Sequence, residues 1–382
     1  MTSGVEWAFR FASEVCRDPA AAVSRWRSLS GRKAAGCIPI HLPEEVLHAA
    51  GMLPVTIWGN EFAPASSAGV PPSLCSVADG IISSIHSGKW EKIDAWVLPS
   101  ACDILRNRCE ASFPPHDERP RFPFVFPPSA DAPGAPEYML DRVEALREWA
   151  GEVSGREVSE GALDCSIRVY NENRRTFALF EERMAESPGF FTGMEFLTFA
   201  RAGMALPKET HTKMLREALA RSNAISAGTR AKVFLTGILA TLPVMEALDE
   251  AGAAIVGNDL ALGNRYYSGS PSESGDMPLS LVRRHLQRDP CSTLHGIGRT
   301  RIEHLFDRFD GSGADRILLL RVRQCEHESG EISGLTDESR KRGIPVLCLD
   351  IDLHGEESTS VRMRIEGFIE QPDNRCHPGR KR

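Results

Sequence analysis

Three of the ten cysteines in this sequence stand where a thiolate could bind a metal. Cys102 lies in Ser100-Ala101-Cys102-Asp103, just after an apolar run that predicts a strand. Ser100 can cap the helix that follows, and Asp103 can return a hydrogen bond to the cap. A thiol in the first turn of a helix feels the positive end of the helix dipole, which lowers its pKa and favours the metal-binding thiolate. Cys102 is therefore a candidate ligand.

Cys75 and Cys325 occupy comparable places. Cys75 lies in Ser73-Leu74-Cys75-Ser76 and opens a predicted helix, while Cys325 follows the predicted strand Ile317 to Val322. The separations of 27 and 223 residues match no local zinc or ferredoxin pattern, so spacing alone does not identify a metal site. Because free cysteine is among the most buried residue types, simple burial of these thiols stays open as the alternative.

The other cysteines have different predicted roles. Four lie inside predicted strands or helices and are expected to be buried: Cys16, Cys37, Cys165 and Cys348. Cys109 follows Cys102 by seven residues on the same helix and is expected to pack in the core. Cys291, in Asp289-Pro290-Cys291-Ser292, is a rival ligand because a proline-led loop would present its thiol much as Cys102 is presented. Cys376 lies in a polar tail and is expected to be exposed.

The elements that would position these thiols alternate between strand and helix. The apolar runs 34–40, 53–58, 95–98 and 122–126 predict strands in the first half, and the runs 232–236, 253–256, 317–322 and 345–349 predict strands in the second. Helical patterns separate them, which implies parallel sheets and a second half that mirrors the first. In such sheets ligands bind beyond the carboxyl ends of the strands, where Cys102 and Cys325 fall.

Length and composition set the wider limits. A chain of 382 residues exceeds what one core usually organises, so we expect an α/β fold of two Rossmann-like parallel-sheet domains with an additional helical region. The expected division, from the amino terminus, is a helical segment over 1–30, a first α/β domain over 31–137, a helical interdomain region over 138–228, a second α/β domain over 229–375 and a tail over 376–382.

The charge and hydropathy patterns exclude several classes of protein. The formal net charge of −7 argues against nucleic-acid binding, which needs a surplus of Lys and Arg. No apolar window is long enough for a transmembrane helix, and the start lacks the pattern of a signal peptide, so we expect a cytoplasmic protein that does not enter the membrane. In that compartment structural disulfides are not expected.

Several segments together resemble one known family, the 2-hydroxyacyl-CoA dehydratases and benzoyl-CoA reductases. The segment 37–55 resembles its first signature, in which a Pro-x-Glu helix leads into Ala-Ala-Gly and a Pro-Val strand. The segments around Cys75 and Cys102 resemble its pair of cysteine motifs, with Cys102-Asp103-Ile104-Leu105-Arg106-Asn107 as the most specific part. The segments 324–326, 343–352 and 362–369 resemble the third cysteine block and the closing helix.

This resemblance implies that Cys75, Cys102 and Cys325 hold a [4Fe–4S] cluster in the interdomain cleft, with a fourth position that no protein cysteine supplies. The stretch after Cys325 departs from the family pattern because it is acidic and lacks the usual aromatic residue and proline. The resemblance also implies three partners: a homologous sister subunit, an ATP-hydrolysing iron–sulfur activator protein and an acyl-CoA substrate. In agreement with a separate activator, the sequence contains no P-loop motif.

The resemblance implies an enzyme subunit but leaves its reaction open. The first reading is an iron–sulfur subunit of a benzoyl-CoA reductase-type enzyme, which performs an ATP-driven, low-potential one-electron reduction of an aromatic acyl-CoA thioester. The second is a subunit of an (R)-2-hydroxyacyl-CoA dehydratase. The third is a non-catalytic subunit that only relays electrons. A cluster-free binding module is a further class, and it would be colourless even when purified without air.

Other polar residues are candidates for supporting roles. Glu45 and His48 are candidate catalytic residues because burial beside a cleft can tune a carboxylate or an imidazole for proton transfer, although Glu45 also suits the first turn of a helix. Arg106 and Asn107 are expected to orient the cofactor-binding loop around Cys102. Arg301 begins a helix and is expected to be solvated, with contact to a coenzyme A phosphate as the alternative.

Overall fold

The computed structural model describes residues 4–59, 75–114, 116–222, 228–294, 299–353 and 359–371. Its first sheet has four parallel strands in the order β2-β1-β3-β4. These strands are β1 (Ala34–Cys37), β2 (Leu53–Thr56), β3 (Ala95–Pro99) and β4 (Arg121–Phe124). β1, β2 and β3 are buried along their whole length, as expected for a parallel sheet covered by helices on both faces.

The second sheet repeats this arrangement with four parallel strands in the order β6-β5-β7-β8. These strands are β5 (Ala231–Gly237), β6 (Ala253–Leu260), β7 (Arg316–Val322) and β8 (Val346–Ile351). Numbered within each half, both orders are the same. The predicted α/β class and the mirrored halves are therefore confirmed.

The amino-terminal segment forms two helices instead of the single predicted one: α1 (Gly4–Arg17) and α2 (Pro19–Ser30). The break falls at Asp18, whose carboxylate accepts a hydrogen bond of 3.1 Å from the backbone N–H of Ala21 and so caps α2. Pro19 then fits the first position of the new helix, where its missing N–H costs nothing.

Four helices accompany the first sheet: α3 (Glu44–Ala49), α4 (Ser76–His86), α5 (Asp103–Ser112) and α6 (Ala135–Ser154). Three more form the middle of the chain: α7 (Glu160–Glu186), α8 (Gly193–Ala202) and α9 (Lys208–Leu219). Seven belong to the rest: α10 (Leu242–Glu250), α11 (Asn264–Tyr267), α12 (Met277–Leu286), α13 (Arg299–Ser312), α14 (Glu326–Ser329), α15 (Ile332–Arg342) and α16 (Thr359–Ile369).

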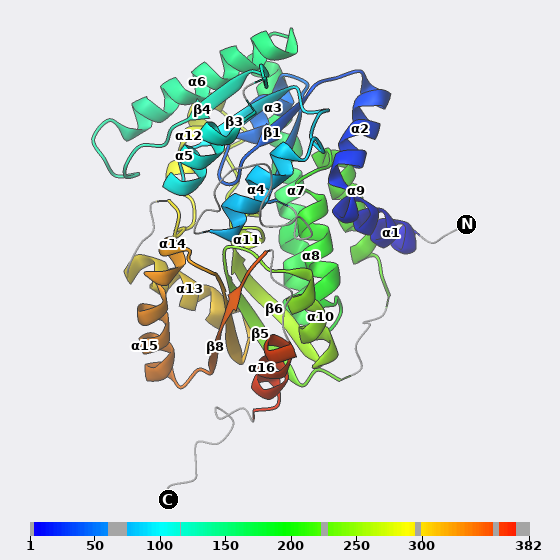
Figure 1. Ribbon diagram of the computed structural model, residues 1–382, viewed down its shortest axis with the longest axis vertical. Coiled ribbons are helices and arrows are strands. Elements are labelled where there is room, and N and C mark those ends of the chain that lie inside the picture. The colour runs from blue at the N-terminus through cyan, green and yellow to red at the C-terminus, as the bar shows by residue number, and fades with distance from the viewer. Residues whose placement is uncertain are drawn as a thin grey trace, which may run out of the picture.

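The two sheets lie one above the other, with α4, α11 and α14 between them and the long helix α7 beside both (Figure 1). α7 joins the halves because it packs on α3 of the first and on β6 of the second. α12 lies far from α6 in sequence but packs against it, and Leu281 and Val282 share the apolar cluster of the first sheet. The proposed domain limits stay a prediction.

None of the helices in the described ranges is long and apolar enough to cross a lipid bilayer.

Candidate metal centre

Cys75, Cys102 and Cys325 line one pocket between the two sheets. The space between its walls, open solvent at the mouth included, is about 490 Å³. Most of the walls are apolar: Pro39, Ile40, Trp58, Val77, Ala101, Ile104, Leu105, Ile238 and Val322. Thr293 and His327 add polar side chains. The sequence-predicted convergence of the three thiols is therefore present in the structure.

Both sheets place this pocket at the same topological point. In each sheet, successive strands are added first on one side of the starting strand and then on the other. This reversal of the strand order falls between β1 and β3 in the first sheet and between β5 and β7 in the second. Ile40 follows β1, Cys102 follows β3, Ile238 follows β5 and Cys325 follows β7. Ligands of open parallel sheets bind at such reversal points, beyond the carboxyl ends of the strands. The pocket thus combines two such sites face to face.

Each of the three cysteines is the N-cap residue of a helix: Cys75 of α4, Cys102 of α5 and Cys325 of α14. Because β3 and β7 hold equivalent places, Cys102 and Cys325 are equivalent positions of the two halves. This differs from the expected capping, since the cap of α5 is Cys102 itself and not Ser100. The Ser100 hydroxyl instead accepts a hydrogen bond of 2.9 Å from the N–H of Phe126. Ser73 lies outside the described residues.

The prediction of a lowered thiol pKa at Cys102 is wrong for the protein alone. Burial raises the pKa of both Cys75 and Cys102, and the backbone N–H groups of the first helical turns only reduce that rise. Burial and the neighbouring carboxylate of Glu328 raise the pKa of Cys325 to about 12. The cost of removing a thiolate from water in an apolar pocket exceeds what a helix terminus returns. Burial therefore favours the protonated form of these thiols in the protein alone.

Glu328 is a functional residue that the sequence reasoning did not find. Its buried carboxylate accepts hydrogen bonds from the N–H of Ile238, at 2.5 Å, and from the N–H of Val322, at 2.6 Å. It thereby ties together the ends of β5 and β7 and fixes the start of α14, where Cys325 stands. No short sequence signal marks this role, because the two partners are 90 and 6 residues away.

Replacing Glu328 by alanine is expected to destabilise the fold, since two buried N–H groups lose their acceptor. Each unsatisfied amide costs about 1–3 kcal/mol. The free energy of unfolding in urea would measure the loss. Glu326→Ala is the matched control, because Glu326 is exposed on the same helix turn, and its unfolding curve is expected to match wild type. Equal stability of both variants would contradict the proposed tie between the strands.

The donor set of the pocket fits an iron–sulfur cluster better than a single ion. Among the residues that the structure describes, no group of three or more His, Cys, Asp or Glu side chains is arranged to hold one metal ion. A [4Fe–4S] cluster imposes a different condition, because each cysteine binds a different iron. Three thiols that start three helices around one apolar pocket are compatible with that condition.

Comparison with known proteins decides the family. The model of the family "2-hydroxyglutaryl-CoA dehydratase, D-component" matches residues 39–371. The chain belongs to this D-component family. The match begins just after β1 and covers the other seven described strands and all three pocket cysteines, so the resemblance seen in the sequence is confirmed.

Relatives of known function cover nearly the whole chain. The β subunit of (R)-phenyllactyl-CoA dehydratase from Clostridium sporogenes is 24% identical over 95% of this chain and 98% of its own length. The β subunit of lactoyl-CoA dehydratase from Anaerotignum propionicum is 27% identical over 96% and 99%. A benzoyl-CoA reductase subunit from Thauera aromatica is 25% identical over 91% and 93%. Members of the D-component family are thus subunits of acyl-CoA dehydratases and of benzoyl-CoA reductase.

The candidate catalytic residues of this D-component chain lie outside the walls of the thiol pocket. Glu45 is fully buried and pairs with Arg174. Burial opposes its ionisation, but Arg174 and Arg284 outweigh that effect and hold the pKa of Glu45 below its usual value. The His48 ring bonds Ser166 at 2.9 Å and faces Glu209 at 3.4 Å. A proton-transfer role for Glu45 and His48 stays a prediction.

Arg106 and Asn107 are not brought to the pocket either. Both are exposed on α5, and Arg106 pairs with Asp103 at 3.2 Å. Their role in orienting the Cys102 loop stays a prediction. Arg301, expected to be solvated, is instead fully buried and pairs with Asp259 and Glu331. That expectation is wrong because α13 packs against β6, where Asp259 is buried.

The rival ligand Cys291 is buried beside the pocket without lining it, although its neighbour Thr293 does line it. Its sulfur accepts a hydrogen bond of 2.9 Å from Arg265 and lies 3.3 Å from the Thr293 hydroxyl. Of the cysteines expected to be buried, Cys37 and Cys109 are buried, whereas Cys165 is exposed. Cys16 and Cys348 are partly exposed, and Cys376 lies outside the described residues. None of the described cysteines forms a disulfide.

Proposed function

We propose that this chain is the cluster-bearing subunit of an enzyme acting on acyl-CoA thioesters, and that Cys75, Cys102 and Cys325 hold its [4Fe–4S] cluster. The observation that carries this proposal is the convergence of three cysteines, each the N-cap residue of a helix, on one apolar pocket at the reversal points of both sheets. When bound, such a cluster supplies single electrons at low potential.

The protein's own residues would prepare the site in two ways. Backbone N–H groups at the starts of α4 and α5 compensate part of the negative charge on the sulfurs of Cys75 and Cys102. Ile40, Trp58 and Ile238 form apolar walls that limit the access of water. A dry, low-dielectric site strengthens every electrostatic interaction inside it. The N–H groups would therefore stabilise the negative charge on the sulfurs more strongly once water is excluded.

The partners in this proposal are a homologous sister subunit, an ATP-hydrolysing iron–sulfur activator protein and an acyl-CoA substrate. The relatives named above are each one subunit of a larger enzyme, which supports a sister subunit. The activator would supply the electron, since no P-loop motif in this chain could bind ATP for that step.

For the reaction, our first candidate is the reduction of an aromatic acyl-CoA, as in a benzoyl-CoA reductase-type enzyme. The similarity to the Thauera benzoyl-CoA reductase subunit over 91% of the chain supports it. The second candidate is the elimination of water from an (R)-2-hydroxyacyl-CoA. The family model and the two dehydratase β subunits support that reading equally well.

One assay separates the two candidates. The chain would be purified without air together with its sister subunit and the activator, then given ATP, a reductant and either benzoyl-CoA or a 2-hydroxyacyl-CoA. A reductase is expected to consume reductant in proportion to a dearomatised product. A dehydratase is expected to form an enoyl-CoA while consuming only a catalytic amount of reductant.

The control omits ATP and is expected to yield neither product. A complex that contains its full complement of iron but transforms neither class of thioester would contradict both candidates.

A further inference from the structure

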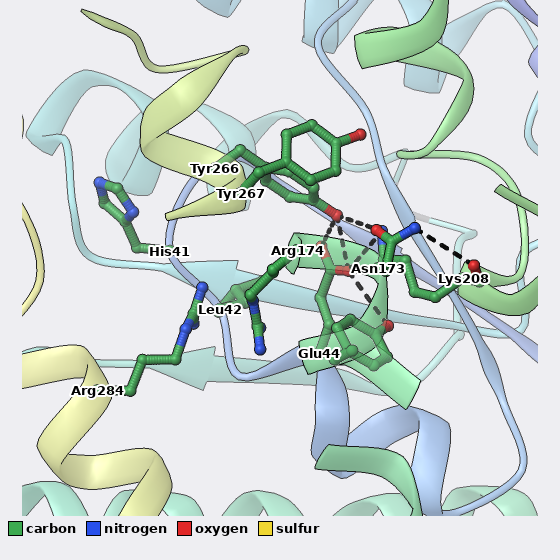
Figure 2. A pocket seen from close by; sticks show the side chains of 10 residues that line it. His41, Leu42, Glu44, Asn173, Arg174, Lys208, Tyr266, Tyr267 and Arg284 are labelled. Atoms are coloured by element: carbon green, nitrogen blue, oxygen red, sulfur yellow. Dashed lines mark hydrogen bonds and ion pairs between the residues drawn. The ribbon is translucent and has the colours of Figure 1, made fainter. Parts of the chain in front are cut away.

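A second cleft lies on the other side of the loop 38–43 from the thiol pocket. Leu42 and Glu44 line it, whereas Pro39 and Ile40 line the thiol pocket. Its remaining walls come from α7, α9, α11 and α12, so it brings together helices from both halves of the chain. The space inside, open solvent included, is about 390 Å³. Charged and phenolic side chains dominate its walls (Figure 2).

One side of this cleft is electrically balanced. The carboxylate of Glu44 lies 3.5 Å from the Lys208 ammonium. It also accepts hydrogen bonds from the Thr56 hydroxyl at 2.6 Å and from the Tyr266 hydroxyl at 2.8 Å. Lys208 in turn donates to the Tyr266 hydroxyl at 2.7 Å. Glu44 and Lys208 therefore offset each other's charge.

The other side carries more positive than negative charge. Arg174 and Arg284 extend toward each other from α7 and α12 (Figure 2). Arg174 pairs with Glu45, whereas Arg284 donates to the backbone carbonyls of Gly269, at 2.9 Å, and Ser268, at 3.2 Å. The charges of Arg284 and Arg174 also act on Arg288, whose guanidinium bonds the backbone carbonyl and the ring of His285. Among the side chains that the structure describes there, three guanidinium groups thus face two carboxylates, Glu45 and the Lys208-paired Glu44.

The pKa values of three neighbouring side chains reflect this surplus of positive charge. Burial, followed by the charge of Arg174, lowers the pKa of Arg284 to about 10. Burial and Arg284 lower the pKa of Arg288 to about 9. Burial and the nearby guanidinium groups also hold the pKa of His285 well below its usual value. Arg284 and Arg288 are partly buried, and cations that are partly withdrawn from water and set against one another are costly unless an anion joins them.

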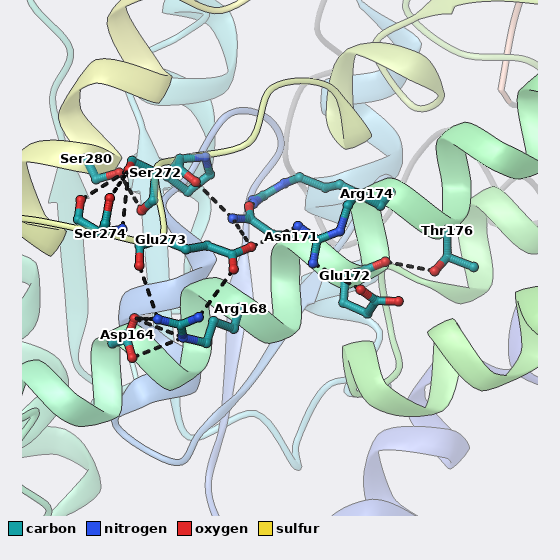
Figure 3. A network of polar contacts seen from close by, with 12 residues as sticks. Asp164, Arg168, Asn171, Glu172, Arg174, Thr176, Ser272, Glu273, Ser274 and Ser280 are labelled. Carbon is teal, nitrogen blue, oxygen red and sulfur yellow. Dashed lines mark hydrogen bonds and ion pairs between the residues drawn. The ribbon is translucent and has the colours of Figure 1, made fainter.

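The polar network around Arg174 keeps this arrangement in place. Asn171 accepts a hydrogen bond of 3.1 Å from Arg174 and donates to the Pro271 carbonyl at 2.8 Å and to Glu273 at 3.0 Å (Figure 3). Glu273 also bonds Arg175 at 2.8 Å. The segment 268–276, whose carbonyls hold Arg284, is therefore fastened to α7. Arg174 and Arg284 are positioned before any ligand arrives.

We propose that the side of the cleft between Arg174 and Arg284 binds a compact oxyanion, a carboxylate or a phosphate. Both anions offer the paired oxygens that a guanidinium fork binds best. The anion would enter as a free ion or as the anionic end of a larger molecule such as a coenzyme A thioester. It would neutralise the surplus charge and bridge α7 to α12.

Calorimetric titration of the full chain with inorganic phosphate, acetate and coenzyme A, in chloride buffer of constant ionic strength, tests this proposal. At least one of the three is expected to bind saturably. Arg284→Gln is expected to weaken that binding by about tenfold or more, the worth of one charge-assisted hydrogen bond. Binding of phosphate and coenzyme A in competition would identify the phosphoryl group, and binding of acetate alone would identify a carboxylate.

The matched control is Arg283→Gln, which removes an exposed arginine from the adjacent position of α12 and is expected to leave binding unchanged. Should Arg284→Gln fail to fold, Arg284→Lys keeps the charge but loses the fork, and its affinity is expected to fall severalfold. The proposal is overturned if no anion binds, or if Arg284→Lys and Arg284→Gln bind as wild type does. Anion binding needs no iron, so this test and the iron analysis of the thiol pocket can fail separately.

Discussion

Replacing Cys102 by alanine is expected to remove most of the iron and acid-labile sulfide from protein purified without air. In our proposal three cysteines hold the cluster, and only two of them, Cys75 and Cys325, would remain in this variant. Burial raises the pKa of both remaining thiols, and none of the described wall residues carries a carboxylate that could replace the lost ligand. Iron analysis and the visible absorption of the cluster would measure the effect.

Cys109→Ala is the matched control for this experiment. Cys109 stands on the same helix as Cys102, and its thiol is buried, but it packs in the apolar core and does not line the pocket. Its removal is expected to lower stability while leaving the iron content near that of wild type. Cys75→Ala and Cys325→Ala are expected to behave as Cys102→Ala does. Full retention of iron in any of these three ligand variants would refute the assignment of that cysteine.

The sheets were predictable from the sequence because each strand is short, apolar and bounded by polar or glycine-containing turns. The run 95–98 predicts a buried strand, and β3 occupies Ala95–Pro99 in the centre of its sheet. Alternation with helices then requires parallel pairing. Parallel pairing puts the carboxyl ends of β3 and β7 on the side of each sheet where ligands bind. The positions of Cys102 and Cys325 follow from local pattern and topology together.

The electrostatics of the site were not predictable in this way. The sequence places Cys102 at the start of a helix but does not reveal that Ile238, from the other half, adds an apolar wall to the pocket around it. Burial then decides the direction of the thiol pKa. Likewise, Arg301 looks solvated in a polar segment, and only the packing of α13 on β6 shows that it is buried against Asp259. Long-range contacts determine which charges lose their water.

The buried ion network around Asp259 leads to the largest expected effect on stability. Asp259 is fully buried at the end of β6, pairs with Arg301 and lies 3.5 Å from the guanidinium of Arg265. Its backbone carbonyl accepts a further hydrogen bond of 3.0 Å from Arg265. Asp259→Asn keeps the shape but removes the carboxylate that two buried guanidinium groups share, and it leaves Glu331 as the remaining carboxylate partner of Arg301. Breaking a buried pair in this way costs about 3–5 kcal/mol, measured as a lower free energy of unfolding in urea.

The contribution of Asp259 to the stability of the fold is also expected to decrease at acidic pH. Burial opposes its ionisation, but Arg301 and Arg265 outweigh burial and hold the pKa of Asp259 below its usual value. A carboxyl whose pKa is lower in the folded state stabilises the fold above the unfolded pKa of about 3.9 and loses that contribution as the pH falls through the folded pKa. The stability difference between wild type and Asp259→Asn is therefore expected to be full near neutrality and to shrink in acid. Asp310→Asn, which removes an exposed carboxylate on α13, should show little difference at either pH, and a wild-type-like Asp259→Asn at neutrality would contradict the role of this network.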